Sequence, residues 1–146
     1  MNLYTIGFTK KSAERFFALI RENGVKLVID VRLRPDTQLS GFAKRSDLGY
    51  FLRELSDCDY QHRPLLAPTG EILDDYRRDH DQRAWGERFI ALMDERAIPQ
   101  AADIEMISSS PCCLLCSEDD ATQCHRSFVA QRMADRIPGL RVVHLQ

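Results

Sequence analysis

The sequence lacks any uninterrupted apolar run of the roughly 18 or more residues that a membrane-spanning helix requires. Its opening residues, Met1-Asn2-Leu3-Tyr4-Thr5, lack the basic segment and following apolar segment of a secretory signal peptide. It also contains no Gly-x-Gly-x-x-Gly fingerprint and no Gly-Lys-Ser or Gly-Lys-Thr phosphate loop. We therefore expect no membrane partner, and the cofactor, if any, stays unknown.

Neither sign of charge is in large excess. Twenty Lys and Arg face 22 Asp and Glu, and the net charge of −2 excludes a protein that coats nucleic acid through a generally basic surface. The five cysteines are an odd number, and four of them form a cysteine-rich motif within Cys112–Cys124. An odd number without an export signal predicts reduced thiols in a cytoplasmic protein.

The chain of 146 residues, 44% of them apolar, is long enough for one domain with a substantial core. Apolar runs typical of buried strands alternate with segments whose apolar residues repeat at helical spacing. We expect strands at Leu3–Ile6, Val25–Val31, Cys112–Ser117 and Arg141–Leu145, with a weaker candidate at Asp59–His62. This alternation predicts a single α/β domain over residues 1–146. It should be a three-layer sandwich in which helices flank a mostly parallel sheet of about four or five strands.

Ligands of open parallel sheets bind outside the carboxyl ends of the strands. Three predicted loops follow such ends and carry small or polar residues suited to a ligand. They are Gly7 with Thr9, Asp30 with Arg32, and Cys116 with Glu118, the last followed by a helix start at Cys124-His125-Arg126. If these strands are neighbours in the sheet, the three loops converge on one site.

The Cys-His-Arg run carries the most chemistry. A helix N-terminus favours an anion, and Arg126 adds a planar cation suited to phosphate or carboxylate. The same field increases the thiolate fraction of Cys124, and His125 can carry a proton near neutral pH. The alternative is a small buried cysteine beside an arginine that is tied to the acids of the preceding loop.

Asp30 and Arg32 also allow two interpretations. Strand alternation places both side chains on the same side of the strand. Arg32 could hold an anion while Asp30 orients it or serves as a base. Alternatively, the two form an internal salt bridge that organises the following loop.

Metal binding is disfavoured by the strand geometry. Cys113 and Cys116, with Cys124 and His125, offer four ligands of the types that zinc takes. Residues three apart on a strand point to opposite faces, so Cys113 and Cys116 cannot both bind one ion. A redox Cys-x-x-Cys belongs at a helix start, whereas this one lies in an apolar run. We therefore assign no metal ligands.

Several segments occur together in a recognisable order and spacing across nearly the whole chain. They are Thr5-Ile6-Gly7, Asp30-Val31-Arg32, Phe42, Leu115-Cys116-Ser117-Glu118 with Cys124-His125-Arg126, and Val143-His144-Leu145. In this order they resemble the family known as domain of unknown function 488. The resemblance implies a compact α/β fold, and it implies polar residues at two strand ends and one helix start, where a site is expected.

Two segments depart from the family pattern. The family usually has Gly-His-Ser after its first strand, where this sequence has Gly7-Phe8-Thr9. It often has Leu-Gly-Gly after its third strand, where this sequence has Leu66-Ala67-Pro68-Thr69-Gly70. A histidine of the first loop therefore has no counterpart here, and a ligand near the second segment would meet a stiffer backbone.

Three functions are consistent with these patterns. The first is an enzyme, a hydrolase or transferase, that acts on an anionic substrate such as a phosphate-bearing nucleotide or a nucleic-acid end. Its catalytic residues would be Glu118 as general acid or base, Cys124 as nucleophile or electrostatic element and His125 as proton carrier. Its substrate-binding residues would be Gly7, Thr9, Asp30, Arg32, Cys116 and Arg126. The second function is a non-catalytic nucleotide or nucleic-acid binding module, and the third is a metal or redox protein built on the cysteines. No pattern indicates the oligomeric state.

Overall fold

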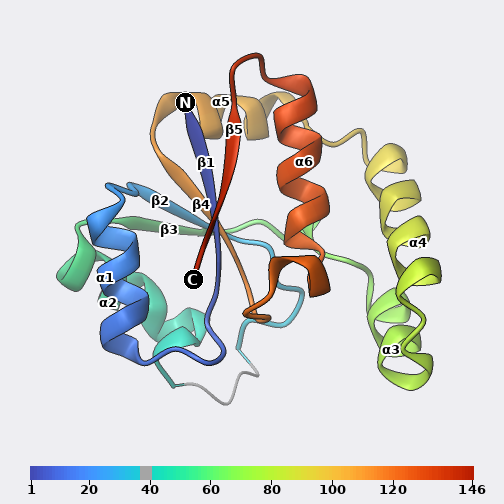
Figure 1. The fold of residues 1–146 in the computed structure, drawn as a ribbon, viewed down its shortest axis with the longest axis horizontal. Coiled ribbons are helices and arrows are strands. Elements are labelled where there is room, and N and C mark those ends of the chain that lie inside the picture. The colour runs from blue at the N-terminus through green and yellow to red at the C-terminus, as the bar shows by residue number, and fades with distance from the viewer. Residues whose placement is uncertain (37–40) are drawn as a thin grey trace.

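A five-stranded parallel sheet forms the middle layer of the computed structural model, which describes residues 1–36 and 41–146 (Figure 1). The strands lie in the order β3-β2-β4-β1-β5, and every neighbouring pair is parallel. They are β1 (Asn2–Gly7), β2 (Leu27–Asp30), β3 (Asp59–His62), β4 (Cys112–Cys116) and β5 (Arg141–Leu145). The predicted α/β fold with a sheet between helices is confirmed.

Helices cover both faces of this sheet. The described residues form α1 (Ala13–Glu22), α2 (Arg45–Ser56), α3 (Gly70–Asp79), α4 (Gln82–Glu95), α5 (Ala101–Ser109) and α6 (Arg126–Arg136). Figure 1 shows α1 and α2 on one side of the sheet, α5 and α6 on the other, and α3 with α4 as a pair beyond α6. None of the described helices is both long and apolar enough to cross a bilayer.

The two faces of β4 point into two separate hydrophobic cores. Cys112, Leu114 and Cys116 pack with α4, α5 and α6, whereas Cys113 and Leu115 pack with α1 and α2. This follows from strand alternation, because successive side chains of a strand point to opposite faces. The predicted separation of Cys113 from Cys116 is therefore confirmed.

Some predicted boundaries shift for local reasons. The second strand begins at Leu27, because the N–H of Val25 still bonds to Ile20 at the end of α1. The helix predicted to start at Cys124-His125-Arg126 begins at Arg126. The Asp120 carboxylate caps a 3₁₀ turn at Ala121–Gln123, accepting bonds from the N–H and hydroxyl of Thr122 at 2.9 and 2.7 Å. Sequence patterns predict a loop over Arg32–Lys44, and residues 37–40 of this range lie outside the described part of the chain.

The sheet order brings three strand ends together. Because β4 lies between β2 and β1, the carboxyl ends Asp30, Cys116 and Gly7 are adjacent. The three strands whose loops were predicted to converge are thus neighbours in the sheet. The segment between β4 and α6 runs across this edge and carries Glu118, Cys124 and His125.

Candidate functional site

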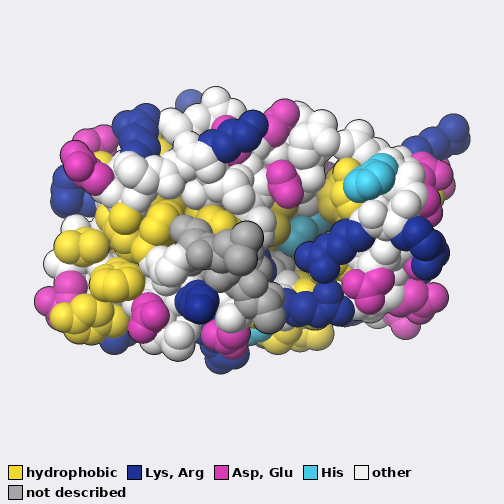
Figure 2. Space-filling model, turned by 90° about the horizontal axis from the view of Figure 1, so that it is seen from below, with side chains coloured by type: hydrophobic (Ala, Val, Ile, Leu, Met, Phe, Trp, Pro, Cys, Tyr) yellow, Lys and Arg dark blue, Asp and Glu magenta, His cyan; other side chains and the backbone are white. Residues whose placement is uncertain are grey.

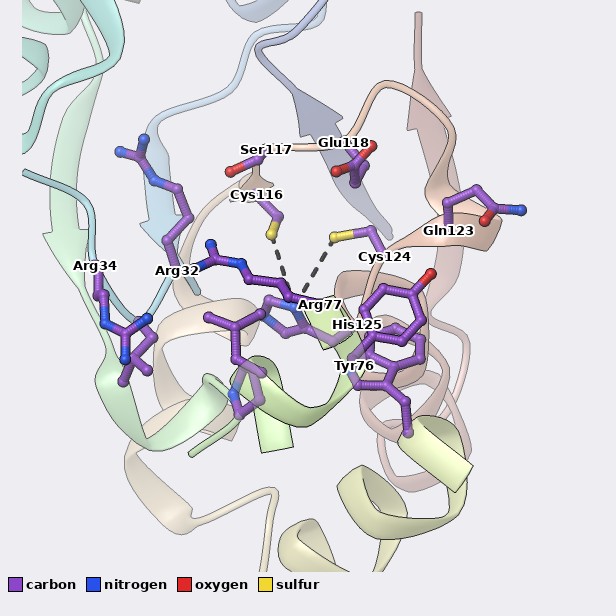
Figure 3. A pocket seen from close by; sticks show the side chains of 14 residues that line it. Arg32, Arg34, Tyr76, Arg77, Cys116, Ser117, Glu118, Gln123, Cys124 and His125 are labelled. Atoms are coloured by element: carbon purple, nitrogen blue, oxygen red, sulfur yellow. Dashed lines mark hydrogen bonds between the residues drawn. The ribbon is translucent and has the colours of Figure 1, made fainter. Parts of the chain in front are cut away.

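A pocket of about 190 Å³ opens beside the carboxyl ends of β2 and β4 (Figure 3). The residues after β2, the helix α3 and the segment Cys116–His125 form most of its lining. Figure 2 shows the face turned toward the viewer from below, where basic side chains border a hollow in which a histidine is visible. The pocket therefore lies at the edge of the sheet where the sequence predicts a site.

Two sulfur atoms and one imidazole nitrogen meet in this pocket, and we call Cys116, Cys124 and His125 the Cys–Cys–His centre. The Nδ1 of His125 lies 3.7 Å from the Sγ of Cys116 and 4.0 Å from the Sγ of Cys124 (Figure 3). All three donor atoms lie within 4.8 Å of one another, and the residues are 6%, 2% and 6% exposed. The structure thus brings together three of the residues that the sequence singled out.

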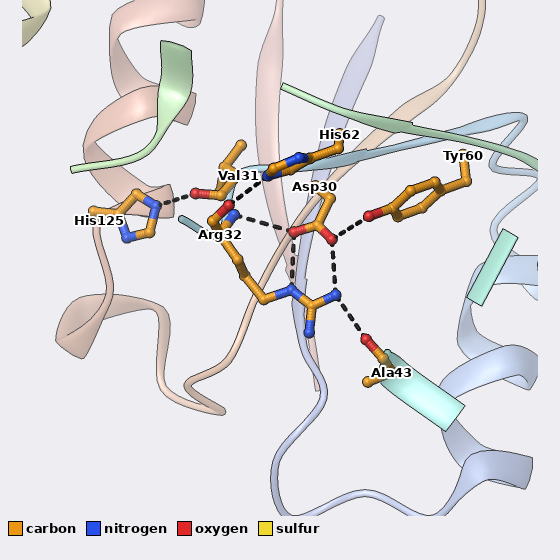
Figure 4. A network of polar contacts seen from close by, with 7 residues as sticks. All are labelled: Asp30, Val31, Arg32, Ala43, Tyr60, His62 and His125. Atoms are coloured by element: carbon orange, nitrogen blue, oxygen red, sulfur yellow. Dashed lines mark hydrogen bonds and ion pairs between the residues drawn. The ribbon is translucent and has the colours of Figure 1, made fainter. Parts of the chain in front are cut away.

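The ring of His125 is held in one orientation. Its Nε2 lies 2.7 Å from the backbone oxygen of Val31 (Figure 4). The rings of His125 and Phe89 form a T-shaped contact, with centres 5.2 Å apart. Because a carbonyl oxygen only accepts, Nε2 carries a hydrogen, and Nδ1 points to the two sulfur atoms. If His125 carries a proton, it therefore does so through Nδ1.

The pKa values of the two thiols in the centre are shifted in opposite directions. Burial alone would raise the pKa of Cys124, but the hydrogen bond with Cys116, the neighbouring His125 and the positive charge of Arg126 outweigh it and bring this pKa well below its ordinary value. The hydrogen bond with Cys124, together with burial, raises the pKa of Cys116. Of the pair, Cys124 is thus the thiol whose pKa is lowered.

Arg77 supplies a cation that the sequence patterns did not single out. It lines the pocket, is exposed, and has no ion pair or hydrogen bond among the described residues (Figure 3). Its neighbours Arg78 and Arg88, by contrast, both bond to Asp75, at 2.7 Å each. Leu73 and Arg77 both line the pocket. They lie four residues apart on α3 and so share one face of the helix, and this spacing is the only feature of the sequence that could have pointed to Arg77.

Glu118 also lines the pocket, with Arg34 on the opposite side (Figure 3). The Glu118 carboxylate is exposed and has no hydrogen bond or ion pair among residues 1–36 and 41–146. Arg34 lies 3.4 Å from Asp74, in a largely exposed ion pair. The position of Glu118 is compatible with the acid or base role that the sequence suggested.

Asp30 and Arg32 form the internal salt bridge that the sequence left open as one of two readings. Asp30 accepts bonds from Nε and Nη2 of Arg32 at 2.9 and 2.7 Å, and from the Tyr60 hydroxyl at 2.5 Å (Figure 4). Nη2 also donates to Ala43, and the guanidinium lies over the Phe8 ring. Of its nitrogens, Nη1 alone has no partner among the described residues. Arg32 lines the pocket, but most of its guanidinium organises the loop after β2.

Arg126 is fully buried and does not line the pocket. Its Nε lies 3.2 Å from the Thr5 hydroxyl, Nη2 lies 3.1 Å from the Asp119 carbonyl oxygen, and Nη1 donates to the Glu118 carbonyl. The alternative of an arginine tied to the preceding loop is closer to what is found, although the acceptors are backbone oxygens and not carboxylates. The predicted anion-binding role of Arg126 therefore has no support in its position.

Gly7 and Thr9 hold the same loop from the other side. A Cβ added to Gly7 would lie 1.8 Å from the carbonyl oxygen of Glu118, so this close approach requires glycine. The N–H and hydroxyl of Thr9 both donate to the Ser117 oxygen, at 3.1 and 2.8 Å. Neither residue lines the pocket, so their predicted contact with substrate is replaced by a supporting position. Phe8, where the family usually has histidine, is buried in the core.

Comparison with known proteins identifies a family and no function. The family model described as "Domain of unknown function DUF488" matches residues 12–133. This range includes Asp30, Arg32 and the whole segment from Cys116 to Arg126, whereas β1 and β5 lie outside it. No curated protein and no solved structure matches the chain.

Replacing Arg126 with methionine should lower the free energy of unfolding by roughly 3 kcal/mol or more, because the hydroxyl of Thr5 and two loop carbonyls lose a charged donor inside the protein. Chemical denaturation measures this value. Arg136→Met is the matched control, since Arg136 is exposed on the same helix, and it should change stability by about 0.5 kcal/mol or less. Equal effects of the two substitutions would contradict the structural role of Arg126.

The cysteines should differ in their rates of alkylation. Burial, first of all, raises the pKa of Cys58 to about 12 and that of Cys112 to about 11, and it raises the pKa of Cys113 as well. In chelator-treated protein near neutral pH, iodoacetamide should therefore modify Cys116 or Cys124 in the pocket before any of these three. Peptide mass spectrometry over a time course gives the order, and early labelling of Cys58 or Cys112 would contradict this arrangement.

Proposed function

We propose that this chain, which belongs to the family of domain of unknown function DUF488, is an enzyme that acts on a phosphate-bearing nucleotide or nucleic-acid end. The observation that carries the proposal is the content of one pocket. It combines the Cys–Cys–His centre, the carboxylate of Glu118 and the cation of Arg77, which is unpaired among the described residues. Reactive groups and a means of holding an anion thus face the same space.

The anion would be bound by Arg77, with Arg34 as a second cation across the pocket. A guanidinium donates two parallel hydrogen bonds to phosphate or carboxylate, which suits this role. Arg77 is also the side chain whose pairing with a ligand would break no interaction with the described residues. This assignment replaces the sequence-based one, since Arg126 is buried elsewhere and Arg32 is largely engaged with Asp30.

A flat ring of the substrate would pack on Tyr76. This side chain lines the pocket and is backed by the indole of Trp85, with ring centres 5.3 Å apart and planes inclined by 31°. Aromatic faces stack on nucleobases with little regard to their identity. The neighbouring positions of Tyr76 and Arg77 on α3 therefore favour a nucleotide over a small inorganic anion.

The reaction would take place at the Cys–Cys–His centre, with Glu118 as general acid or base. These groups suit hydrolysis or transfer of the phosphate group. Glu118 can accept or donate the proton, and the charged groups of the Cys–Cys–His centre can stabilise the charge that develops in the transition state. The five free thiols also favour a reducing compartment, and we propose the cytoplasm as the place of action.

Substrate binding is tested by Arg77→Ala against Arg78→Ala. Arg78 is the adjacent residue on α3, is mostly exposed, and pairs with Asp75 away from the pocket. With adenosine monophosphate as the probe, Arg77→Ala should weaken binding roughly tenfold or more by calorimetry, while Arg78→Ala should leave it nearly unchanged. Binding by the wild type should also weaken with salt. Equal affinities of the two variants would refute the assigned anion site.

Turnover is tested with Glu118→Gln and Cys124→Ser on a panel of nucleotides and short oligonucleotides, with release or transfer of phosphate as the readout. Both variants should fold, and each should lose roughly a hundredfold or more of the activity. If both retained full activity on an identified substrate, the proposed chemistry would be excluded. Salt-sensitive nucleotide binding by a wild type without any turnover would instead identify a binding module.

A further inference from the structure

The Cys–Cys–His centre is more than the proposed chemistry of one thiolate requires. Its donor atoms come from three successive elements: Cys116 ends β4, Cys124 follows the 3₁₀ turn, and His125 caps α6. Each residue is more than nine-tenths buried, yet each lines the pocket. Three ligand-type side chains thus meet within 4.8 Å at the edge of the sheet, in an arrangement that could hold one ion.

The orientation of His125 is that of a metal ligand. Histidines bound to metals typically donate their second ring N–H to a carbonyl or carboxylate, which fixes the tautomer and leaves the other nitrogen bare for the metal. The bond of 2.7 Å between Nε2 and the Val31 carbonyl does this here. The bare Nδ1 then faces the sulfur atoms of both cysteines, and not of one alone.

The separations within the centre also suit an ion. Zinc bonds of about 2.3 Å to sulfur and about 2.0 Å to nitrogen, at a tetrahedral angle, hold the two ligand atoms roughly 3.5 Å apart. The observed separations of 3.7 and 4.0 Å are close to this value and are long for direct hydrogen bonds. A disulfide between the cysteines, by contrast, would leave Nδ1 without a partner.

Charge balance favours a divalent ion. Two thiolates and a neutral imidazole around a doubly charged cation form a neutral group, which is the form that burial tolerates best. Zinc and copper both take thiolate and imidazole ligands, and a doubly charged ion without redox chemistry, as zinc is, matches the charge of two thiolates. Cys113 points to the opposite face of β4 and takes no part in this centre. The sequence argument excluded a four-ligand site that includes Cys113, and it does not apply to a site with three ligands.

We propose that Cys116 Sγ, Cys124 Sγ and His125 Nδ1 bind one zinc ion whose fourth coordination position opens into the pocket. Three protein ligands with an open fourth position are typical of catalytic zinc sites. This assignment deepens the proposed function and rests on it for the use of the open position. There, a zinc-bound water would lose its proton to Glu118 and attack the phosphorus of the substrate. The bond to the leaving oxygen would break, and this oxygen would take up the proton.

Metal content gives the first test. Purified full-length protein should contain about one zinc ion per chain by elemental analysis. After removal with a chelator, cobalt(II) should restore a thiolate-to-cobalt charge-transfer band together with the visible bands of tetrahedral cobalt. The absence of both stoichiometric zinc and a cobalt–thiolate spectrum would overturn the proposal, as would a Cys116–Cys124 disulfide in freshly purified protein.

Variants assign the ligands. Cys116→Ser and Cys124→Ser should each remove about half of the charge-transfer intensity and weaken zinc binding at least tenfold, whereas Cys58→Ser, which removes a buried thiol of the other core, should change neither. Should a variant fail to fold, zinc protection of the wild type from iodoacetamide gives the same assignment by mass spectrometry. Protection of both Cys116 and Cys124 supports the site, and protection of neither overturns it.

The two proposals can fail separately. Zinc binding with equal nucleotide affinities of the Arg77→Ala and Arg78→Ala variants would leave the metal site in place and remove the proposed function. Loss of nucleotide binding in Arg77→Ala alone, in a protein that binds neither zinc nor cobalt, would leave the proposed function and remove the metal site.

Discussion

The buried guanidinium of Arg126 is the interaction on which the candidate site depends. From the first turn of α6 it reaches β1 through the Thr5 hydroxyl and holds the loop after β4 by two backbone oxygens. A cation without a water shell is costly, and three acceptors offset that cost because they are fixed by the sheet and the loop. Glycine at position 7 and the two bonds of Thr9 close the loop from the other side. The path from Cys116 to His125 is thereby fixed.

The end of β2 supplies the second constraint. Asp30 binds Arg32 and Tyr60, and this network holds the backbone that presents the Val31 carbonyl to His125. Neighbouring strand ends thus set the position of the sulfur atoms and the orientation of the imidazole. Both buried arginines stabilise the loops of the site, although Arg32 also lines the pocket. The arginines to which ligand contact is assigned by proposal, Arg34 and Arg77, come from outside this framework.

Patterns in the sequence predicted the fold well, because apolar runs such as Cys112–Cys116 are buried on both faces and helical stripes face the sheet. They predicted that the loops carrying Cys116, Cys124 and His125 converge with those after the first two strands only if these strands are neighbours, and the observed sheet order meets this condition. They left two interpretations open for Arg126 and for Arg32, because charge alone does not tell whether an arginine meets a ligand or a buried acceptor. The sequence patterns did not single out Arg77, because its position relative to the pocket depends on the tertiary structure. Only the position of α3 in the folded chain, where it lines the pocket together with the segment after β4, places that residue there.

The central claim is that the Cys–Cys–His centre and Arg77 serve one ligand site. A crystal structure of the protein grown with zinc and adenosine monophosphate, with anomalous data collected at the zinc edge, tests it most directly. We expect an anomalous peak between Cys116 Sγ, Cys124 Sγ and His125 Nδ1, and the phosphate beside Arg77 with its oxygen toward the metal. A disulfide in place of the peak, or a nucleotide bound away from Arg77, would contradict the account.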